Sequence, residues 1–223
     1  MTSLTRRPWL LPSALILLST VPVLAGGLRI GELASGAQVT AENARFFADP
    51  IPVVVHIIGA TTFCLLGAFQ FSPYFRRRWP RWHRVAGRIV ASCGLTTALS
   101  GMYMAVFYQE PADVGALLTG FRLVFGSAMA VSLVLGFVAI LRRDVVTHRA
   151  WMIRGYAIGL GAGTQLLTVA PWTLLVGPVD KLSNALLMLA GWLINIAVAE
   201  WVIRRSVIRR ARIARARQVA VMS

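Results

Sequence analysis

Residues 75–88 read FRRRWPRWHRVAGR and stand between two long apolar runs. This stretch concentrates six arginines, two tryptophans and one histidine. A related stretch, residues 141–154, reads LRRDVVTHRAWMIR and again places His-Arg ahead of an apolar run. Tryptophan is enriched at the headgroup level of membranes, and arginine gathers in the loops of one side. The two stretches therefore predict how the chain crosses a membrane, and they hold its most distinctive chemistry.

The composition of the whole chain is that of a polytopic membrane protein. Its 223 residues are 57% hydrophobic and 14% charged, and the mean hydropathy is +0.68. A helix needs about 20 apolar residues to cross a bilayer, so six runs qualify. The runs are continuously apolar and do not alternate, which favours helices over a β-barrel. We expect one membrane domain, an all-α bundle of about six transmembrane helices. They cover residues 9–30, 52–74, 85–108, 117–141, 151–176 and 182–203.

The formal net charge of +15 is distributed unevenly along the chain. If the six segments alternate in direction, the amino terminus, residues 75–88, residues 141–154 and the tail from residue 204 share one side. That side holds most of the arginines, and the other holds six of the eight acids. Cationic loops remain cytoplasmic, so both termini are expected in the cytoplasm of a bacterial inner-membrane protein. The charge is therefore an orientation signal, and we expect no nucleic-acid partner.

The two ends of the chain have their own interpretations. Residues 1–30 fit a retained first span, and the alternative is a signal peptide that starts with Arg6-Arg7. We favour the retained span, an uncleaved signal anchor, because the apolar run continues to Ile30. Residues 41–47 fit a short interfacial helix or an irregular loop. The basic tail, residues 206–223, is expected to lie on anionic lipid.

Two histidines are the candidate metal ligands. His83 and His148 each fall in the first turn of an apolar segment, and each precedes an arginine. At His83 the positive end of the helix and the neighbours Arg81 and Arg84 favour the neutral imidazole. A neutral imidazole can bind iron or accept a proton. Gly87 follows His83 by four residues and leaves room beside the ring.

Arginines beside the histidines extend this candidate site. Arg84 and Arg88 are four residues apart, so they share a helical face that can hold a carboxylate or phosphate. Arg149 and Arg154 follow the second histidine. Together these side chains predict a cofactor site, with haem b as the candidate. The alternative needs no cofactor, because a loop with an aromatic belt on lipid phosphate explains the same arginines and tryptophans.

The polar residues inside the predicted spans include His56, Gln70, Arg122 and Gln165. An ionisable group at membrane depth is a functional hypothesis by default. A lone imidazole or amide can also simply bond a neighbouring helix. A polar path through these four residues would suit a proton-coupled transporter, although no span holds a deep carboxylate.

Two further patterns concern packing. Gly155, Gly159 and Gly163 recur every four residues and predict close helix contacts rather than a nucleotide-binding loop. A Leu-rich pattern ending in glycine precedes each His-Arg pair, which predicts a duplicated helical hairpin. Glu200 precedes Arg204 by four residues and predicts an ion pair within the last segment.

Four segments together resemble a bacterial family of predicted multi-pass membrane proteins, domain of unknown function 2306. They are VVVHIIGA at 53–60, GAFQFSP at 67–73, RRRWPRWHRVAGR at 76–88 and HRAWMIR at 148–154. The resemblance covers roughly residues 50–205, and it implies a helical inner-membrane protein without a particular activity. The positions that it carries over are His56, Gln70, His83, Arg84, Arg88, His148, Arg149 and Arg154.

Three functional classes stay open at this point. The first is a redox protein in which His83 and His148 bind one haem b while arginines hold its propionates. Transmembrane cytochromes b, which the bundle resembles in outline, usually carry four histidines, and this chain has three. The second class is a proton-coupled transporter. The third is a non-catalytic assembly factor that binds anionic lipid, a second copy or another membrane protein. A hydrolase is excluded, because no Ser-His-Asp set or carboxylate pair is placed for one.

Overall fold

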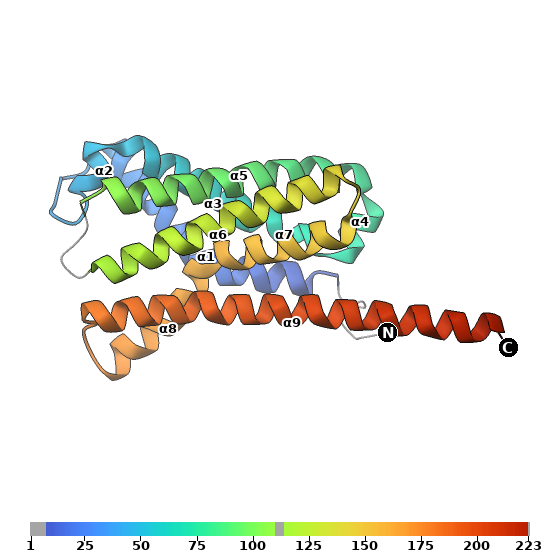
Figure 1. Ribbon diagram of the computed structural model, residues 1–223. Coiled ribbons are helices and arrows are strands. Elements are labelled where there is room, and N and C mark those ends of the chain that lie inside the picture. Colours follow the sequence, from blue (N-terminus) through green and yellow to red (C-terminus); the bar gives the residue numbers. More distant parts are fainter. Residues whose placement is uncertain (1–7, 110–113, 223) are drawn as a thin grey trace.

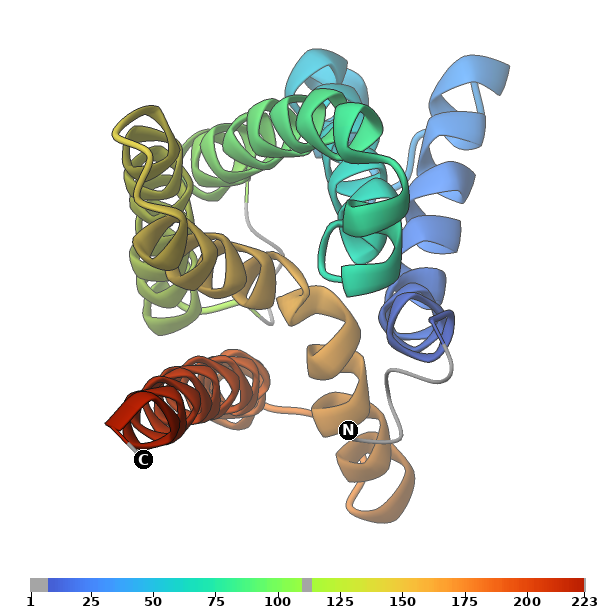
Figure 2. The ribbon, with the colours of Figure 1, turned by 90° about the vertical axis from the view of Figure 1, so that its right-hand side faces the viewer.

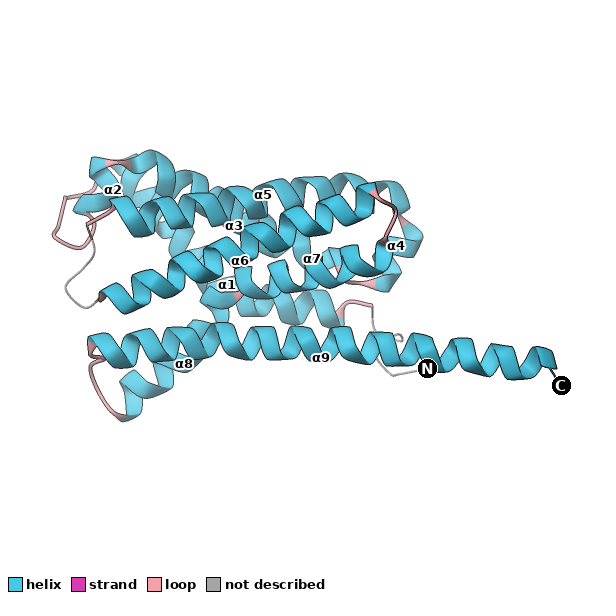
Figure 3. Ribbon diagram, in the orientation of Figure 1, coloured by secondary structure: helices cyan, strands magenta, loops and turns pink. Residues whose placement is uncertain are grey.

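The computed structural model describes residues 8–109 and 114–222, and every regular element within them is a helix (Figure 3). The predicted all-helical fold is therefore confirmed. Residues 41–47, expected as a short helix or a loop, overlap helix α2. The helices are α1 (Leu10–Ser35), α2 (Ala44–Ala48), α3 (Pro50–Gln70), α4 (Pro73–Arg78), α5 (Pro80–Phe107), α6 (Ala116–Leu141), α7 (Val145–Gly159), α8 (Gly161–Leu175) and α9 (Lys181–Met222).

Five helices are long and apolar enough to cross a membrane, namely α1, α3, α5, α6 and α9. Helices α7 and α8 are long and apolar enough only when taken together, and they bend by 41° at the break between them, which makes the pair either a broken sixth span or a re-entrant loop. Only Leu160 separates the two helices, and a glycine stands on each side of it. The predicted segment 151–176 thus consists of two helices with a break between them. Breaks at membrane depth persist where protein or a cavity surrounds the interrupted backbone.

Different connections lie at the two ends of the bundle (Figure 1). Helix α4 and the connection from α6 to α7 lie at one end, near both ends of the described chain. We call this the arginine-rich end, since it carries residues 75–88 and 141–154. Helix α2, the last turn of α5 and the connection from α8 to α9 lie at the opposite end. The described chain thus begins and ends near the same end of the bundle, and the side of the membrane on which this end lies stays a prediction.

Helix α7 occupies the centre of the bundle (Figure 2). It packs against α3, α5, α6 and α9, while α8 turns away to lie between α1 and α9. The buried core around α7 contains Phe63, Met129, Leu133 and Tyr156. The hydroxyl of Tyr156 donates a hydrogen bond of 2.7 Å to the carbonyl oxygen of Cys64, which joins α7 to α3.

The glycines of the broken span allow its neighbours to come close, as predicted. A Cβ atom at Gly159 would lie 2.5 Å from the ring of Phe63. One at Gly163 would lie 2.1 Å from the carbonyl oxygen of Leu18 on α1. These distances are far shorter than a van der Waals contact, so a larger residue would push the helices apart. Close approach at small residues is the usual basis of helix packing in membranes.

Two predictions about where helices begin and end need correction. The stretch between the second and third predicted spans, residues 75–84, was expected as a loop but is almost wholly helical, because α4 and α5 are separated by Trp79 alone. Pro73 and Pro80 open these helices, a position where the missing N–H of proline costs nothing. The tail is not a separate segment either, since α9 runs unbroken from Lys181 to Met222 and extends beyond the bundle (Figure 1).

Candidate functional site

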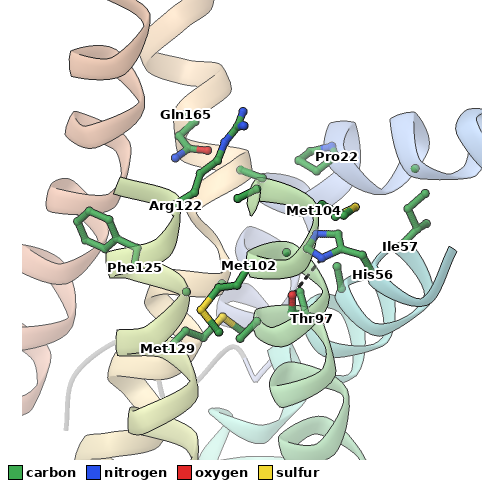
Figure 4. A pocket seen from close by; sticks show the side chains of 18 of the residues that line it. Pro22, His56, Ile57, Thr97, Met102, Met104, Arg122, Phe125, Met129 and Gln165 are labelled. Carbon is green, nitrogen blue, oxygen red and sulfur yellow. Dashed lines mark hydrogen bonds between the residues drawn. The ribbon is translucent and has the colours of Figure 1, made fainter. Parts of the chain in front are cut away.

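A cavity of about 510 Å³ lies inside the bundle and reaches its opposite end. Helices α1, α3, α5, α6, α7, α8 and α9 all contribute to its wall, which is mostly apolar. Its polar side chains include His56, Arg122 and Gln165 (Figure 4). Cavities of this size, with apolar walls and a few convergent polar groups, are the usual form of small-molecule sites. The structure therefore brings together three of the four polar residues selected from the predicted spans.

His56 is held in one orientation by helix α5. Its Nδ1 atom lies 3.0 Å from the carbonyl oxygen of Thr97 and 3.2 Å from the hydroxyl of Ser100. A carbonyl oxygen only accepts, so Nδ1 carries the proton of the neutral ring and Nε2 is left as an acceptor. Gly101 makes room for the ring, because a Cβ there would lie 3.2 Å from the Cε1 atom of His56.

Arg122 and Gln165 lie across the cavity from His56 (Figure 4). Gln165 is buried one turn after the break between α7 and α8. Its amide nitrogen donates to the carbonyl oxygen of Met188 at 3.1 Å, which ties α8 to α9. Gly191 allows this approach, since a Cβ there would lie 2.7 Å from the Cγ atom of Gln165. The break in the span thus determines where this amide meets the cavity.

The two candidate metal ligands both lie at the arginine-rich end. His83 and His148 occupy the same position in their helices, one turn after the starts of α5 and α7. They are near enough for their charges to interact. His148 Nδ1 donates to the carbonyl oxygen of Gly136 on α6 at 2.8 Å. The buried Nδ1 atom of His83 has no hydrogen-bond partner in the described part of the chain. The two histidines therefore occupy equivalent positions in their helices but differ in their hydrogen bonding.

The start of α7 is fixed by a capping residue. The carboxylate of Asp144 accepts hydrogen bonds from the backbone N–H groups of Val146 and Thr147. The side chain of Thr147, together with these backbone bonds, lowers the pKa of Asp144 below its ordinary value. Helix α5 begins with Pro80 and has no side-chain cap. The start of α7, which carries His148, is thus capped by a carboxylate, whereas the start of α5 has no such cap.

The arginines predicted to hold a cofactor do not gather. Arg84 and Arg88 are exposed on α5, and Arg149 is half-buried. Arg154 instead binds Glu200 on α9, with Nε 2.6 Å from one carboxylate oxygen and Nη2 3.2 Å from the other. This pair corrects the prediction of a Glu200–Arg204 bridge. That prediction considered one helix alone, whereas the fold brings α7 alongside α9.

Gln70 lies apart from the other polar residues of the spans. It ends α3 at the arginine-rich end, and its amide oxygen would be 3.4 Å from a Cβ placed at Gly87. Gly87 therefore does leave space beside the first turn of α5, and the end of the Gln70 side chain occupies part of it. The amide nitrogen of Gln70 is buried without a hydrogen-bond partner among the described residues. A path through all four polar residues is thus interrupted by the core around Tyr156.

The described residues fit a haem only in part. Residues 8–109 and 114–222 contain no group of three His, Cys, Asp or Glu side chains that could hold a metal ion. Two imidazoles would suffice for haem iron, and the bond from His148 to a carbonyl is usual for a ligating histidine. However, Arg154 is engaged with Glu200, and neither His83 nor His148 lines the cavity. The cavity is the better-formed site.

Sequence reasoning missed most of the cavity wall. Thr97, Ser100 and Gly101 look like ordinary small residues of a span, and only the fold shows that they orient His56. The one available signal was the paired glycines around Leu160, since glycines flanking one residue suggest an interruption of a helix. The break that they permit places Gln165 at the cavity.

The comparisons with known proteins identify a family. A family model described as "Predicted membrane protein (DUF2306)" matches residues 53–203. The match includes both histidine-bearing stretches and the three polar cavity residues. No curated protein and no solved structure matches the chain. Because the family model covers well over half of the sequence, this chain belongs to the DUF2306 family of predicted membrane proteins.

Proposed function

We propose that the protein binds a small amphipathic organic acid in the central cavity and carries it across the membrane. The observation behind this proposal is the convergence of His56, Arg122 and Gln165 in one cavity of about 510 Å³ to which every span contributes. A cavity of that size accommodates a ligand of drug-like dimensions. The function is thus assigned to the region with the best-formed concave surface.

The chemistry of the lining favours an acid. The guanidinium groups of Arg45 and Arg122 both line the cavity. A guanidinium binds a carboxylate through two parallel hydrogen bonds. The Nε2 atom of His56 can accept a proton from a neutral acid. Phe125 and Met129 offer an apolar surface for the remainder of the ligand.

The broken span favours a carrier over a static receptor. Discontinuous helices beside a central site recur in secondary transporters, where one part of the bundle moves against the other. Here the break lies next to the cavity, with Ile158 and Gly159 on one side and Ala162 on the other, all in its wall. Towards the arginine-rich end, the cavity stops at the core around Phe63 and Tyr156. Release at that end would need a movement of α7.

Ligand-induced stabilisation of purified protein tests the binding step. The probes are octanoate, octanol and octylamine, which share an apolar body and differ in head group. Octanoate is expected to raise the unfolding temperature most, because only a carboxylate can form the bidentate pair with Arg122. A ligand at 100 times its Kd adds about 2.7 kcal/mol of stability. Arg122→Gln should remove the advantage of octanoate over octanol, while Arg88→Gln, at an exposed site on α5, should preserve it.

Transport is tested separately in proteoliposomes. Uptake of labelled octanoate by wild type should exceed that by protein-free vesicles, and Arg122→Gln should abolish the excess. Binding without any excess uptake would leave a receptor and reject the carrier. Equal stabilisation by all three probes would reject the acid-binding site itself.

A second candidate function is binding of one haem by His83 and His148. The observation that favours it is the placement of both rings at one end, with His148 bonded to Gly136 in the orientation of a metal ligand. Protein expressed with ample haem should then be red, and both His83→Ala and His148→Ala should be colourless. A colourless wild type without bound iron would reject this function and leave the cavity proposal untouched.

A further inference from the structure

Two buried polar atoms at the arginine-rich end have no partner in the described chain. They are the amide nitrogen of Gln70, on α3, and the Nδ1 atom of His83, on α5. Buried donors without a partner are rare in folded proteins and reduce stability. They lie far along the bundle from the cavity, which contains neither residue. A ligand that accepts hydrogen bonds from both atoms would explain them.

The two atoms belong to neighbouring surfaces. Gln70 is the last residue of α3, and its side chain lies against Gly87. Gly87 follows His83 by one helical turn, so both are on one face of α5. Only the amide oxygen of Gln70 comes within 4 Å of a Cβ placed at Gly87. Among the described residues, no other side chain comes that close to this position.

The charges around this face are positive. His83 experiences the charges of Arg76, Arg84 and His148. Asp144, on the neighbouring connection, is engaged with the first amides of α7, and Glu200 is engaged with Arg154. The amide nitrogen of Gln70 is a donor, and Nδ1 of a neutral or charged imidazole can be one. Two donors in a positive field suit an oxygen atom that carries negative charge.

We propose that Gln70 and His83 form a second site, which binds an oxyanion of the phosphate class at the arginine-rich end. The amide nitrogen and Nδ1 each donate to the anion, and Arg76 and Arg84 supply the surrounding positive charge. The anion is either the headgroup of an anionic lipid or free phosphate. This site is independent of the organic-acid cavity, because the two share no residue.

The test measures unfolding temperatures of detergent-purified protein with four additions. They are phosphatidylglycerol, phosphatidylcholine, inorganic phosphate and, for ionic strength, chloride. Phosphatidylglycerol alone should raise the temperature if the site holds a lipid headgroup, and inorganic phosphate should also do so if it holds a free anion. Gln70→Leu and His83→Phe should each weaken the apparent affinity for the effective anion at least about tenfold, the loss of one charge-assisted hydrogen bond.

A second readout separates this site from a merely structural role. Without any added anion, Gln70→Leu should be at least as stable as wild type, because a buried unpaired amide has been replaced by an apolar group. Arg142→Gln is the matched control, an exposed arginine at the same end, and should keep the full response to anion. Gly87→Leu, which fills the space beside the ring, should lose that response as well.

Three outcomes would overturn the proposal. One is an equal response to all four additions. Another is an unchanged response in Gln70→Leu and His83→Phe. The third is a large loss of stability in anion-free Gln70→Leu, which would mean that the amide is bonded within the protein. Loss of the octanoate effect in Arg122→Gln, with the phosphate response intact, would concern the cavity and leave this site standing.

Discussion

The two ends of the bundle differ in how their candidate functional groups can be recognised. The arginine-rich end holds the conspicuous motifs, residues 75–88 and 141–154, and there the histidines lie at equal positions with unequal bonding. The opposite end has no motif, yet residues from every span meet there around a cavity. The two motifs therefore lie at the predicted membrane boundary. The cavity instead forms where single polar residues from several helices come together.

The cause of this difference lies in helix contacts. Near the cavity, α8 approaches α1 and α9 at glycines, and the break at Leu160 directs Gln165 inward. At the arginine-rich end, the helices are joined by polar bonds, such as that between Arg154 and Glu200. If this comparison is correct, substitutions at the two ends should differ in their effects on stability and on the response to octanoate.

The largest effect is expected for Gly163→Ala, on α8 beside the cavity. The new methyl group would meet the carbonyl oxygen of Leu18 at 2.1 Å, and backbone cannot rotate away as a side chain can. Overpacking of this kind should cost about 3 kcal/mol of unfolding free energy. It should also eliminate the response to octanoate, because α1 and α8 both line the cavity. Unfolding temperatures with and without octanoate measure both effects.

Gly27→Ala is the control for that substitution. Gly27 lies on α1, and no atom comes within 4 Å of a Cβ placed there. Its stability and its octanoate response should equal those of wild type. If Gly163→Ala behaved like Gly27→Ala, the close contact between α1 and α8 would not hold the cavity together.

A smaller effect is expected at the ion pair between α7 and α9. Arg154→Gln should reduce stability by about 1.5 kcal/mol, the lower end for hydrogen bonds to charged groups, because the pair is part-exposed. Arg88→Gln, at an exposed arginine, should change it by less than about 0.5 kcal/mol. A double-mutant cycle with Glu200→Gln measures the coupling. A cycle without coupling would mean that the pair contributes nothing to the contact of α7 with α9.

The fold could be predicted because it follows from composition and hydropathy. Continuous apolar runs indicated helices, and the starts of α3, α6 and α9 came within two residues of their expected positions. The helical state of residues 75–84 was missed, since arginine and tryptophan at a membrane surface suit a loop and a helix equally. Pro73 and Pro80, which begin helices, were the overlooked signals.

The candidate site was predictable only as a set of residues. His56, Arg122 and Gln165 were selected because polar groups at membrane depth are expensive. Which of them meet depends on the rotation of each helix and on the break at Leu160, and neither follows from a hydropathy pattern. The partners of Arg154 and Glu200 were missed for the same reason, because helices distant in sequence supply them.

The duplicated hairpin stays a prediction. The connection before His83 contains helix α4, whereas the one before His148 is only three residues, 142–144.

The smallest effect concerns the two histidine-bearing helix starts and depends on pH. The pKa of Asp144 is lowered in the folded protein by its hydrogen bond with the side chain of Thr147 and by its bonds to the amides of Thr147 and Val146. Its contribution is therefore complete above the ordinary aspartate pKa, near 3.9, and is lost as the pH falls through the lower folded value. Asp144→Ala should speed hydrogen exchange of the first turn of α7 at pH 7, and the difference from wild type should shrink at low pH.

Asp144→Asn, which caps without titrating, should stay close to wild type at pH 7. The start of α5, which has no side-chain cap, is the internal control, and its exchange should be unchanged in both variants. Equal exchange of α7 in Asp144→Ala and wild type at pH 7 would mean that the cap does not hold the helix that carries His148.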